Sequence, residues 1–265
     1  YNMVYRLDAM EAYNKRLVKK IAVKGITESG STATEGFVYL ESINLSKADP
    51  TATIQFDYIG AKGLRKKTAT VGIGYNLYDN SGESGKLDEY KEGFVVKSID
   101  GRDNSVEFLN GVKIFAGDVI GKVSEDQLRR IQIRETILSH LERERQLFHK
   151  GIKVLSLFFI DEVAKYKQYD EAGHPFNGIY ADMFEEEYND ILSSMQREIG
   201  DEDYIRYLDA ISAHDTHAGY FSVDKKGKMT DSKLSDKKEG TSDDIDAYDL
   251  IMKNKELLLD RDPKK

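Results

Sequence analysis

The side chains in this sequence best suited to chemistry form a basic cluster of Lys62, Arg65, Lys66 and Lys67. Alternating apolar residues on both sides of the cluster predict two strands joined by a hairpin, with the cluster at its tip. Exposed lysines and arginines at such a tip can contact the phosphate backbone of a nucleic acid. The alternative is a strand edge that carries lysines for solubility and to block edge-to-edge pairing. Both interpretations stay open, and the cluster is the candidate nucleic-acid contact.

Two histidines close together in the sequence raise the question of a metal site. His214 and His217 are separated by Asp215 and Thr216, a spacing that can bring two imidazoles near one ion. Protein zinc sites use three or four ligands, and no third ligand is evident here at helical or turn spacing. We therefore predict no metal site. A metal hydrolase built on His214, Asp215 and His217 is the least favoured function.

An acidic pair, Asp161-Glu162, follows an apolar run and has the outline of the magnesium-binding motif of nucleotide hydrolases. That motif works only beside a phosphate-cradling loop, and the sequence contains no Gly-x-x-x-x-Gly-Lys-Ser/Thr. We therefore expect Asp161 to be a helix N-cap, whose carboxylate accepts hydrogen bonds from the backbone of Val163 and Ala164.

The composition bounds the class of protein. The 265 residues are 40% hydrophobic and 32% charged, enough for one large domain or two ordinary ones. There is no cysteine, which excludes disulfides, thiolate metal sites and cysteine nucleophiles. No apolar run approaches the roughly 20 residues of a membrane-spanning helix, and the first residues show no signal-peptide pattern. We expect a cytoplasmic protein with no membrane partner. Its net charge of -8 leaves room only for a local basic surface.

The first half of the chain changes from helical to strand-like patterns. Residues 1–25 have apolar residues at three- and four-residue spacing and predict an amphipathic helix. Residues 26–36 predict a loop, and short alternating segments follow up to residue 123. Asn110-Gly111 between two apolar runs is a strong hairpin signal. These patterns predict a small antiparallel barrel or sandwich over residues 26–123.

The second half alternates between helical and apolar segments. Ser124 and Gln127 have the form of a capping box, and the apolar stripe that follows predicts one long helix ending at Gly151. Residues 152–160 form a nearly continuous apolar run, which is typical of a parallel strand covered on both faces. Further helices are predicted over residues 182–199 and 243–259. The rhythm is that of a layered α/β domain, so the whole chain is predicted to be mixed α and β.

Several blocks of sequence resemble a known family in their order and composition. They are YRLDA at 5–9, LVKKI at 17–21, IRETI at 133–137, GIKVLSLFFID at 151–161, GYFS at 219–222, DKKGK at 224–228 and DAYDLIM at 246–252. Together they resemble the middle of the Res subunit of Type III restriction–modification enzymes. That subunit is a superfamily 2 helicase-like DNA translocase driven by ATP, with a separate nuclease domain.

The resemblance implies three parts. Residues 1–25 would be a linking helix from a first RecA-like domain, residues 26–123 a β-rich module, and residues 124–265 part of a second RecA-like domain. It implies DNA and a modification methyltransferase subunit as partners of the parent enzyme, and ATP with Mg²⁺ as its cofactors. The motifs that bind ATP and cut DNA are not among these residues, so the resemblance implies no catalytic or cofactor-binding residue here. The alternative is a stand-alone nucleic-acid-binding or interaction module without catalysis.

Overall fold

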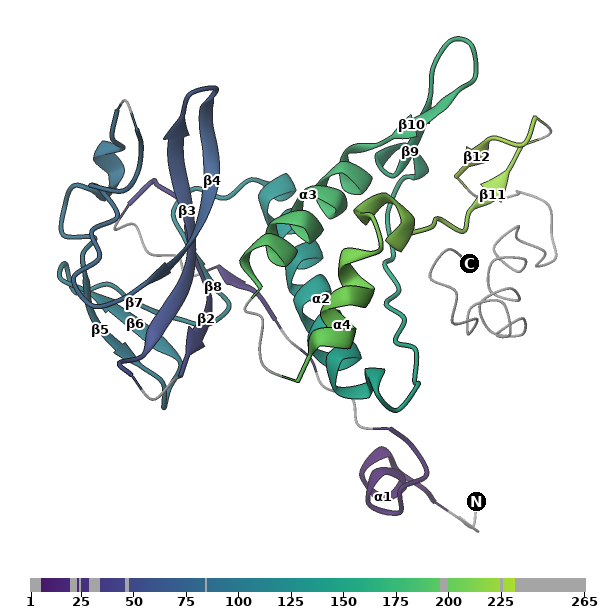
Figure 1. Ribbon diagram of the computed structural model, residues 1–265, viewed down its shortest axis with the longest axis horizontal. Coiled ribbons are helices and arrows are strands. Elements are labelled where there is room, and N and C mark those ends of the chain that lie inside the picture. Colours follow the sequence, from purple (N-terminus) through teal and green to yellow (C-terminus); the bar gives the residue numbers. More distant parts are fainter. Residues whose placement is uncertain are drawn as a thin grey trace. The chain divides into compact units, whose positions relative to one another are not determined.

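The computed structural model describes residues 6–19, 23, 25–28, 34–45, 48–83, 85–195, 200–224 and 226–231. It divides into two compact units, Tyr1–Val123 and Ser124–Lys265, called here the N-terminal unit and the C-terminal unit (Figure 1). Helices and antiparallel sheets both contribute, which confirms the predicted mixed α and β class. None of the helices in the described part of the chain is long and apolar enough to cross a membrane.

The N-terminal unit contains two sheets. One has five strands in the order β1 (Thr27–Glu28), β8 (Asp118–Ile120), β2 (Val38–Asn44), β3 (Thr51–Gly60) and β4 (Gly63–Val71). The other has three, in the order β5 (Val96–Asp100), β6 (Ser105–Phe108) and β7 (Lys113–Phe115). All neighbouring strands are antiparallel except β1 and β8. A short helix, α1 (Ala9–Asn14), and a 3₁₀ turn, η1 (Asp88–Tyr90), complete the described elements.

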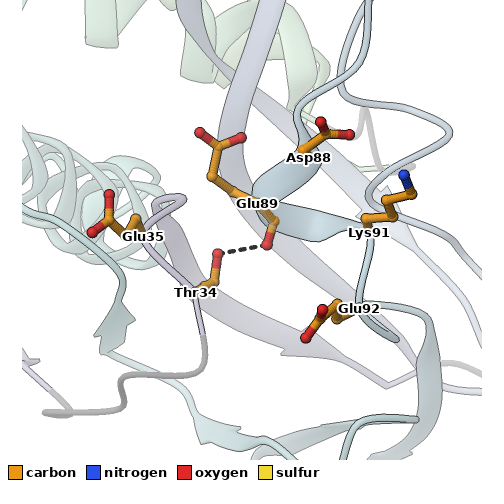
Figure 2. Close-up of a pocket in the computed structure, with 6 residues that line it drawn as sticks. All are labelled: Thr34, Glu35, Asp88, Glu89, Lys91 and Glu92. Atoms are coloured by element: carbon orange, nitrogen blue, oxygen red, sulfur yellow. Dashed lines mark hydrogen bonds between the residues drawn. The ribbon is translucent and has the colours of Figure 1, made fainter.

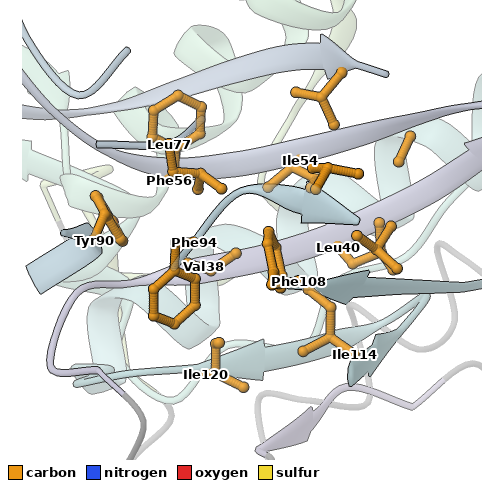
Figure 3. Packing of buried hydrophobic residues seen from close by; sticks show 14 of the residues in the cluster. Val38, Leu40, Ile54, Phe56, Leu77, Tyr90, Phe94, Phe108, Ile114 and Ile120 are labelled. Atoms are coloured by element: carbon orange, nitrogen blue, oxygen red, sulfur yellow. The ribbon is translucent and has the colours of Figure 1, made fainter. Parts of the chain in front are cut away.

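A single core unites the two sheets (Figure 3). Along β3, alternate side chains point inward because successive residues of a strand face opposite sides. Ile54 and Phe56 from the larger sheet and Val106 and Phe108 from the smaller sheet are fully buried in the same cluster. The sequence pattern predicts a small antiparallel barrel or sandwich, and the structure has two sheets that share one core, the arrangement of a sandwich.

The hairpin predicted at Asn110-Gly111 is confirmed between β6 and β7. Gly111 has φ +83°, a left-handed conformation that favours glycine. The side chain of Asn110 accepts a hydrogen bond from the backbone N–H of Val112 at 3.1 Å, which stabilises the turn locally.

The hydroxyl of Tyr90 joins η1 to two strands of the larger sheet. It donates a hydrogen bond to the carbonyl of Phe37 at 2.6 Å and accepts one from the backbone N–H of Asp57 at 2.9 Å. Burial, and then the charge of Asp57, raises the pKa of this phenol, so it stays protonated. The Asp57 carboxylate also accepts a hydrogen bond from the Phe37 N–H at 3.0 Å. Tyr90 and Asp57 together satisfy backbone groups where β2 begins.

The C-terminal unit is built on three helices, α2 (Glu125–Phe148), α3 (Ile179–Ser194) and α4 (Glu202–Asp209), which lie side by side in Figure 1. Two 3₁₀ turns and two short hairpins accompany them: η2 (Val163–Lys165), β9 (Lys167–Tyr169), β10 (Pro175–Asn177), η3 (Ala213–Thr216), β11 (Ser222–Val223) and β12 (Met229–Thr230). The predicted capping box at Ser124 and Gln127 is confirmed, with both reciprocal hydrogen bonds present. Apolar side chains of all three helices share a core.

A buried ion-pair network fixes α2 against α3. Arg134 on α2 is only 1% exposed, and its Nη1 donates to Glu187 Oε2 and Asp190 Oδ2 on α3, each at 2.7 Å. Arg130, one turn earlier, reaches Glu187 Oε1 at 2.9 Å and Glu186 at 2.7 Å. Glu187 is buried as well, and both arginines are paired with it.

The parallel strand predicted over residues 152–160 is wrong. The segment runs as an extended trace between α2 and β9 and belongs to no strand (Figure 1). Its side chains are largely exposed, up to 91% at Phe159. Its contacts include a hydrogen bond between Ser156 and His140 at 2.9 Å and an edge-on ring contact of Phe158 with Phe184. The apolar run predicts burial, but a strand needs neighbouring strands for its backbone groups, and none of the described strands pairs with it.

The continuous helix predicted over residues 1–25 is also wrong in extent. The helix α1 ends at Asn14, and Arg16 has φ +59°, which an α-helix does not allow. Met10 and Leu17 on the predicted apolar face are exposed. Short helices are marginal unless tertiary packing covers an apolar face, so a periodic pattern alone does not ensure a long helix. Residues 1–5, 20–22 and 24 lie outside the described part, as does the helix predicted over residues 243–259.

The cap expected at Asp161 is formed by another residue. The Val163 N–H donates instead to Asp231 Oδ1 at 2.7 Å, 68 positions along the chain. Asp161 accepts from the Glu162 N–H at 3.1 Å and is ion-paired with Lys165, and the Lys165 hydrogen bond lowers the pKa of Asp161. The Asp161 carboxylate is thus engaged by the adjacent Glu162 N–H and by Lys165, and not by the Val163 N–H.

Replacing Tyr90 by phenylalanine tests the hydroxyl network. Tyr90→Phe leaves a buried Asp57 N–H and Phe37 carbonyl without this partner, so the N-terminal unit should lose about 1–3 kcal/mol of unfolding free energy. Chemical denaturation, with hydrogen exchange in β2 and β3, measures the loss. The control is Tyr75→Phe, whose ring packs edge-on against Phe56 in the same core. Equal stability of the two variants would contradict the assignment.

Removing Arg134 tests the ion-pair network. Arg134→Ala leaves Glu187 buried beside one fewer cation, so the C-terminal unit should lose about 3–5 kcal/mol. The double change Arg134→Met with Glu187→Leu should recover most of that loss. Arg129→Ala removes a surface arginine paired with Glu125 one turn away and should cost less than about 1 kcal/mol. Hydrogen exchange in α2 and α3 reports the difference, and similar losses for Arg134→Ala and Arg129→Ala would refute the buried network.

Candidate functional site

The basic cluster lies on a hairpin formed by β3 and β4. The two strands pair without a break from Ala52 opposite Val71 to Gly60 opposite Gly63, and Ala61 and Lys62 form the turn. Gly63 has φ +107°, so a glycine is needed for the tight reversal. The hairpin predicted around this cluster is therefore present. We call Lys62, Arg65 and Lys67 the tip cations.

Two of the tip cations, Arg65 and Lys67, lie over one aromatic ring. The Arg65 guanidinium lies over the ring of Tyr58 at 5.0 Å, and Lys67 Nζ lies over the same ring at 4.7 Å. The hydroxyl of Tyr58 donates to Glu83 Oε1 at 2.9 Å, which raises the pKa of that phenol. Lys62 and Arg65 are exposed and Lys67 is half-buried. Cations stacked on an aromatic face keep their charge at the surface with less side-chain freedom to lose on binding.

Lys66 lies apart from the tip cations. Its ammonium forms an ion pair with Asp57 and lies 3.8 Å from the centre of the Phe37 ring, and only 19% of its side chain is exposed. Burial lowers the pKa of Lys66, while the hydrogen bond and charge of Asp57 act in the opposite direction. The sequence placed Lys66 with its neighbours, but the two-residue period of a strand turns it to the other face, where it anchors Asp57.

The two histidines meet a carboxylate that comes from a distant part of the chain. Glu185 on α3 places Oε1 3.0 Å from His214 Nδ1 and 3.3 Å from His217 Nε2. A third group therefore accompanies this pair, although none lies at helical or turn spacing from it. Asp215, the nearest carboxylate in sequence, instead accepts a hydrogen bond from Ser212 at 2.8 Å. We call Glu185, His214 and His217 the histidine–glutamate cluster.

No local pattern in the sequence indicated Glu185. It lies 29 and 32 positions before the two histidines, within an acidic run that suits the positive end of a helix dipole. The sequence indicates that Glu185 needs a polar partner, but it does not identify that partner. Only the fold brings His214 and His217 next to it.

Aromatic rings fix the orientation of His217. Its ring lies edge-on to Phe184 at 4.9 Å and to Tyr166 at 5.6 Å between centroids. The Tyr166 hydroxyl is 2.9 Å from His217 Nδ1, so the opposite nitrogen, Nε2, faces Glu185. Burial lowers the pKa of His217, against the opposing effect of Glu185, and burial raises the pKa of Tyr166 to about 12. Asn177 donates to Glu185 Oε1 at 2.8 Å and holds the carboxylate in place.

A shallow pocket in the N-terminal unit has the wrong charge for a phosphate ligand. Figure 2 shows it, with the Thr34 hydroxyl donating to the Glu89 carbonyl at 2.7 Å. Four carboxylates and one cation complete its lining: Glu35, Asp88, Glu89, Glu92 and Lys91. Repulsion between these carboxylates and a polyanion disfavours nucleotide or DNA binding here.

Comparison with known proteins gives three related relatives. The chain is 29% identical to the Type III restriction-modification enzyme EcoP15I Res subunit of Escherichia coli, over 98% of this chain and 24% of that protein. It is 32% identical to the EcoPI Res subunit of Escherichia phage P1, over 60% of this chain and 15% of that protein. It is 26% identical to the StyLTI Res subunit of Salmonella typhimurium, over 96% of this chain and 24% of that protein.

No protein-family model and no solved structure matches the chain. The chain spans about a quarter of the length of the curated relatives that it matches along most of its own length. All three relatives are Res subunits, and two of the similarities extend over almost the whole chain. This chain is therefore similar, over nearly all of its length, to a segment of the Res subunits of Type III restriction–modification enzymes, which confirms the resemblance predicted from its motifs.

Proposed function

We propose that this chain is a segment of an ATP-driven, DNA-cleaving Res subunit, in which it helps to hold the DNA and carries neither the ATPase nor the nuclease chemistry. The observation that carries the proposal is the similarity to Res subunits over 98% of the chain. The full enzyme would work in the cytoplasm with a modification methyltransferase subunit, and would use ATP and Mg²⁺ bound by residues outside this segment. The sequence has no phosphate-binding loop, which supports that division of labour.

The apolar segment at residues 152–160 also supports a role within a larger protein. Ile152, Leu155, Leu157 and Phe159 are each at least half exposed. Water-exposed apolar side chains in a contiguous segment usually mark a surface that another part of a protein covers. A stand-alone binding module, the alternative function, would gain stability by burying them.

The tip cations are the part of the segment best placed to meet DNA. Lys62 lies in the two-residue turn that joins β3 and β4, and Arg65 and Lys67 follow it on β4, so the three cations are spread along the end of a long hairpin (Figure 1). The contact would be independent of sequence, because it is made by cations and not by groups that read base edges.

The isolated chain should not hydrolyse ATP. We expect no turnover above background with duplex DNA and Mg²⁺, because the sequence lacks the loop that holds the β- and γ-phosphates. A phosphate-release assay beside a full-length Type III enzyme as positive control measures this. DNA-stimulated ATP hydrolysis by the isolated chain would contradict the proposal that the ATPase residues lie outside this segment.

Removing the tip cations should weaken DNA binding and its dependence on salt. For the triple variant Lys62→Ala, Arg65→Ala and Lys67→Ala, the slope of log K against log salt should decrease by about 0.9 for each phosphate that the protein no longer neutralises. Fluorescence anisotropy with a duplex at several salt concentrations gives the slope. The matched control, Lys97→Ala, Arg102→Ala and Lys113→Ala, removes three cations that are already paired with acidic residues on the smaller sheet.

The control separates local contact from total charge. An equal change of slope in both triple variants would mean that net charge alone acts and would reject the hairpin as the DNA contact. Lys66→Met adds a second check, because this residue is paired with Asp57. It should lower the stability of the N-terminal unit while leaving the salt slope unchanged.

A further inference from the structure

The histidine–glutamate cluster has the composition of a metal site. One ligand atom from each residue, Glu185 Oε1, His214 Nδ1 and His217 Nε2, lies within 4.8 Å of the other two. Two imidazoles and one carboxylate are a known protein ligand set for zinc, in which water or another molecule takes the fourth position. The three residues come from α3, from η3 and from the position directly after η3, so only the folded C-terminal unit assembles them.

The separations suit tetrahedral coordination. Ligand atoms roughly 2.0–2.1 Å from a tetrahedral zinc ion are separated from each other by roughly 3.3 Å. The two measured separations from Glu185 Oε1, 3.0 Å to His214 and 3.3 Å to His217, are close to that edge length. Two of the three edges therefore already match a tetrahedral site, and the third, between His214 Nδ1 and His217 Nε2, is at most 4.8 Å.

Two neighbours already orient the ligands. Metal-bound histidines usually bond through their second ring nitrogen to a polar group, which fixes ring and tautomer. Tyr166 occupies that position, 2.9 Å from Nδ1 of His217, and its hydroxyl oxygen can accept a hydrogen bond from Nδ1–H when Nε2 binds a cation. Asn177 holds the carboxylate through Oε1 at 2.8 Å. Two of the three candidate ligands, His217 and Glu185, are therefore each oriented by a further hydrogen bond, as is usual for metal ligands.

The cluster is closed on its inner side and open to solvent on the other. The His217 side chain is 13% exposed and is enclosed by Phe184 and Tyr166, whereas the His214 side chain is 67% exposed. An ion can enter past His214, and water can complete its coordination from the same side. The open fourth position distinguishes this geometry from a closed four-ligand structural site.

We propose that Glu185, His214 and His217 bind one divalent first-row transition metal ion, with Zn²⁺ as the ion that best suits the two imidazoles and the carboxylate. The ion would tie the segment around η3 to α3 and so stabilise the C-terminal unit. Hard cations such as Mg²⁺ prefer oxygen ligands and should not compete at this site.

The test is metal binding by the full chain. Protein freed of metal with a chelator and then dialysed is titrated with Zn²⁺ by isothermal calorimetry, and with Mg²⁺ in parallel. We expect one Zn²⁺ per chain, no heat of binding for Mg²⁺, and a thermal midpoint that rises with Zn²⁺. Co²⁺ in place of Zn²⁺ should give the intense visible absorption of a tetrahedral site with nitrogen and oxygen ligands.

The ligand variants locate the ion. His214→Ala and Glu185→Gln should each weaken Zn²⁺ binding by more than about tenfold, and Tyr166→Phe, which keeps the ring but removes the hydroxyl, by about tenfold. His214→Ala carries the most weight, because its exposed side chain can be removed without disturbing the core. The matched control is His174→Ala. His174 Nδ1 lies 3.1 Å from Asp170 in an exposed pair of the same chemistry, but no third ligand among the described residues joins that pair.

Two outcomes would overturn the proposal. One is the absence of stoichiometric Zn²⁺ binding by the unmodified chain, which would leave the cluster as a hydrogen-bonded link between α3 and η3. The other is equal Zn²⁺ affinity of His214→Ala and the unmodified chain, with loss of affinity in His174→Ala, which would place the ion elsewhere. Circular dichroism of each variant confirms that it is folded, so a loss of binding reports the site and not unfolding.

Discussion

The buried ion pair between Arg134 and Glu187 constrains how α3 packs against α2, and the arrangement of the C-terminal unit follows from that constraint. The two buried charges stay in contact because removing one partner of a buried pair costs about 3–5 kcal/mol. The pair therefore fixes both the spacing of the helices and the rotation of α3 about its axis. The buried side chains of α3, such as Met183 and Tyr188, restrict the same rotation through close packing.

The rotation of α3 has a direct consequence for its opposite face. Glu185 precedes Glu187 by two residues, which places the two side chains about 200° apart around the helix. With Glu187 held against α2, Glu185 must project to the other side, where His214 and His217 meet it. One helix thus carries two carboxylates with separate tasks: one is neutralised by arginines in the interior, and the other faces imidazoles at a solvent-accessible edge.

A comparable division occurs in the N-terminal unit, with the signs reversed. On one face of the β3–β4 hairpin, the Asp57 carboxylate forms an ion pair with Lys66 and accepts a hydrogen bond from the backbone N–H of Phe37. Arg65 and Lys67 alternate with Lys66 along the strand, so they face the Tyr58 ring and solvent. Three consecutive basic residues therefore divide into one structural cation and two surface cations, and only the surface cations are suited to an anionic partner.

Local patterns in the sequence determined the elements whose partners lie nearby. The capping box at Ser124, the turn at Asn110-Gly111 and the β3–β4 hairpin were all predicted, because each depends on residues a few positions apart. The order of the sequence blocks also predicted the similarity to Res subunits. What only the tertiary structure decided were the contacts between distant residues. Asp231 and not Asp161 accepts from Val163, Glu185 joins two histidines, and residues 152–160 pair with none of the described strands. An apolar or charged side chain specifies the kind of partner that it needs, but the folded backbone determines which partner comes within reach.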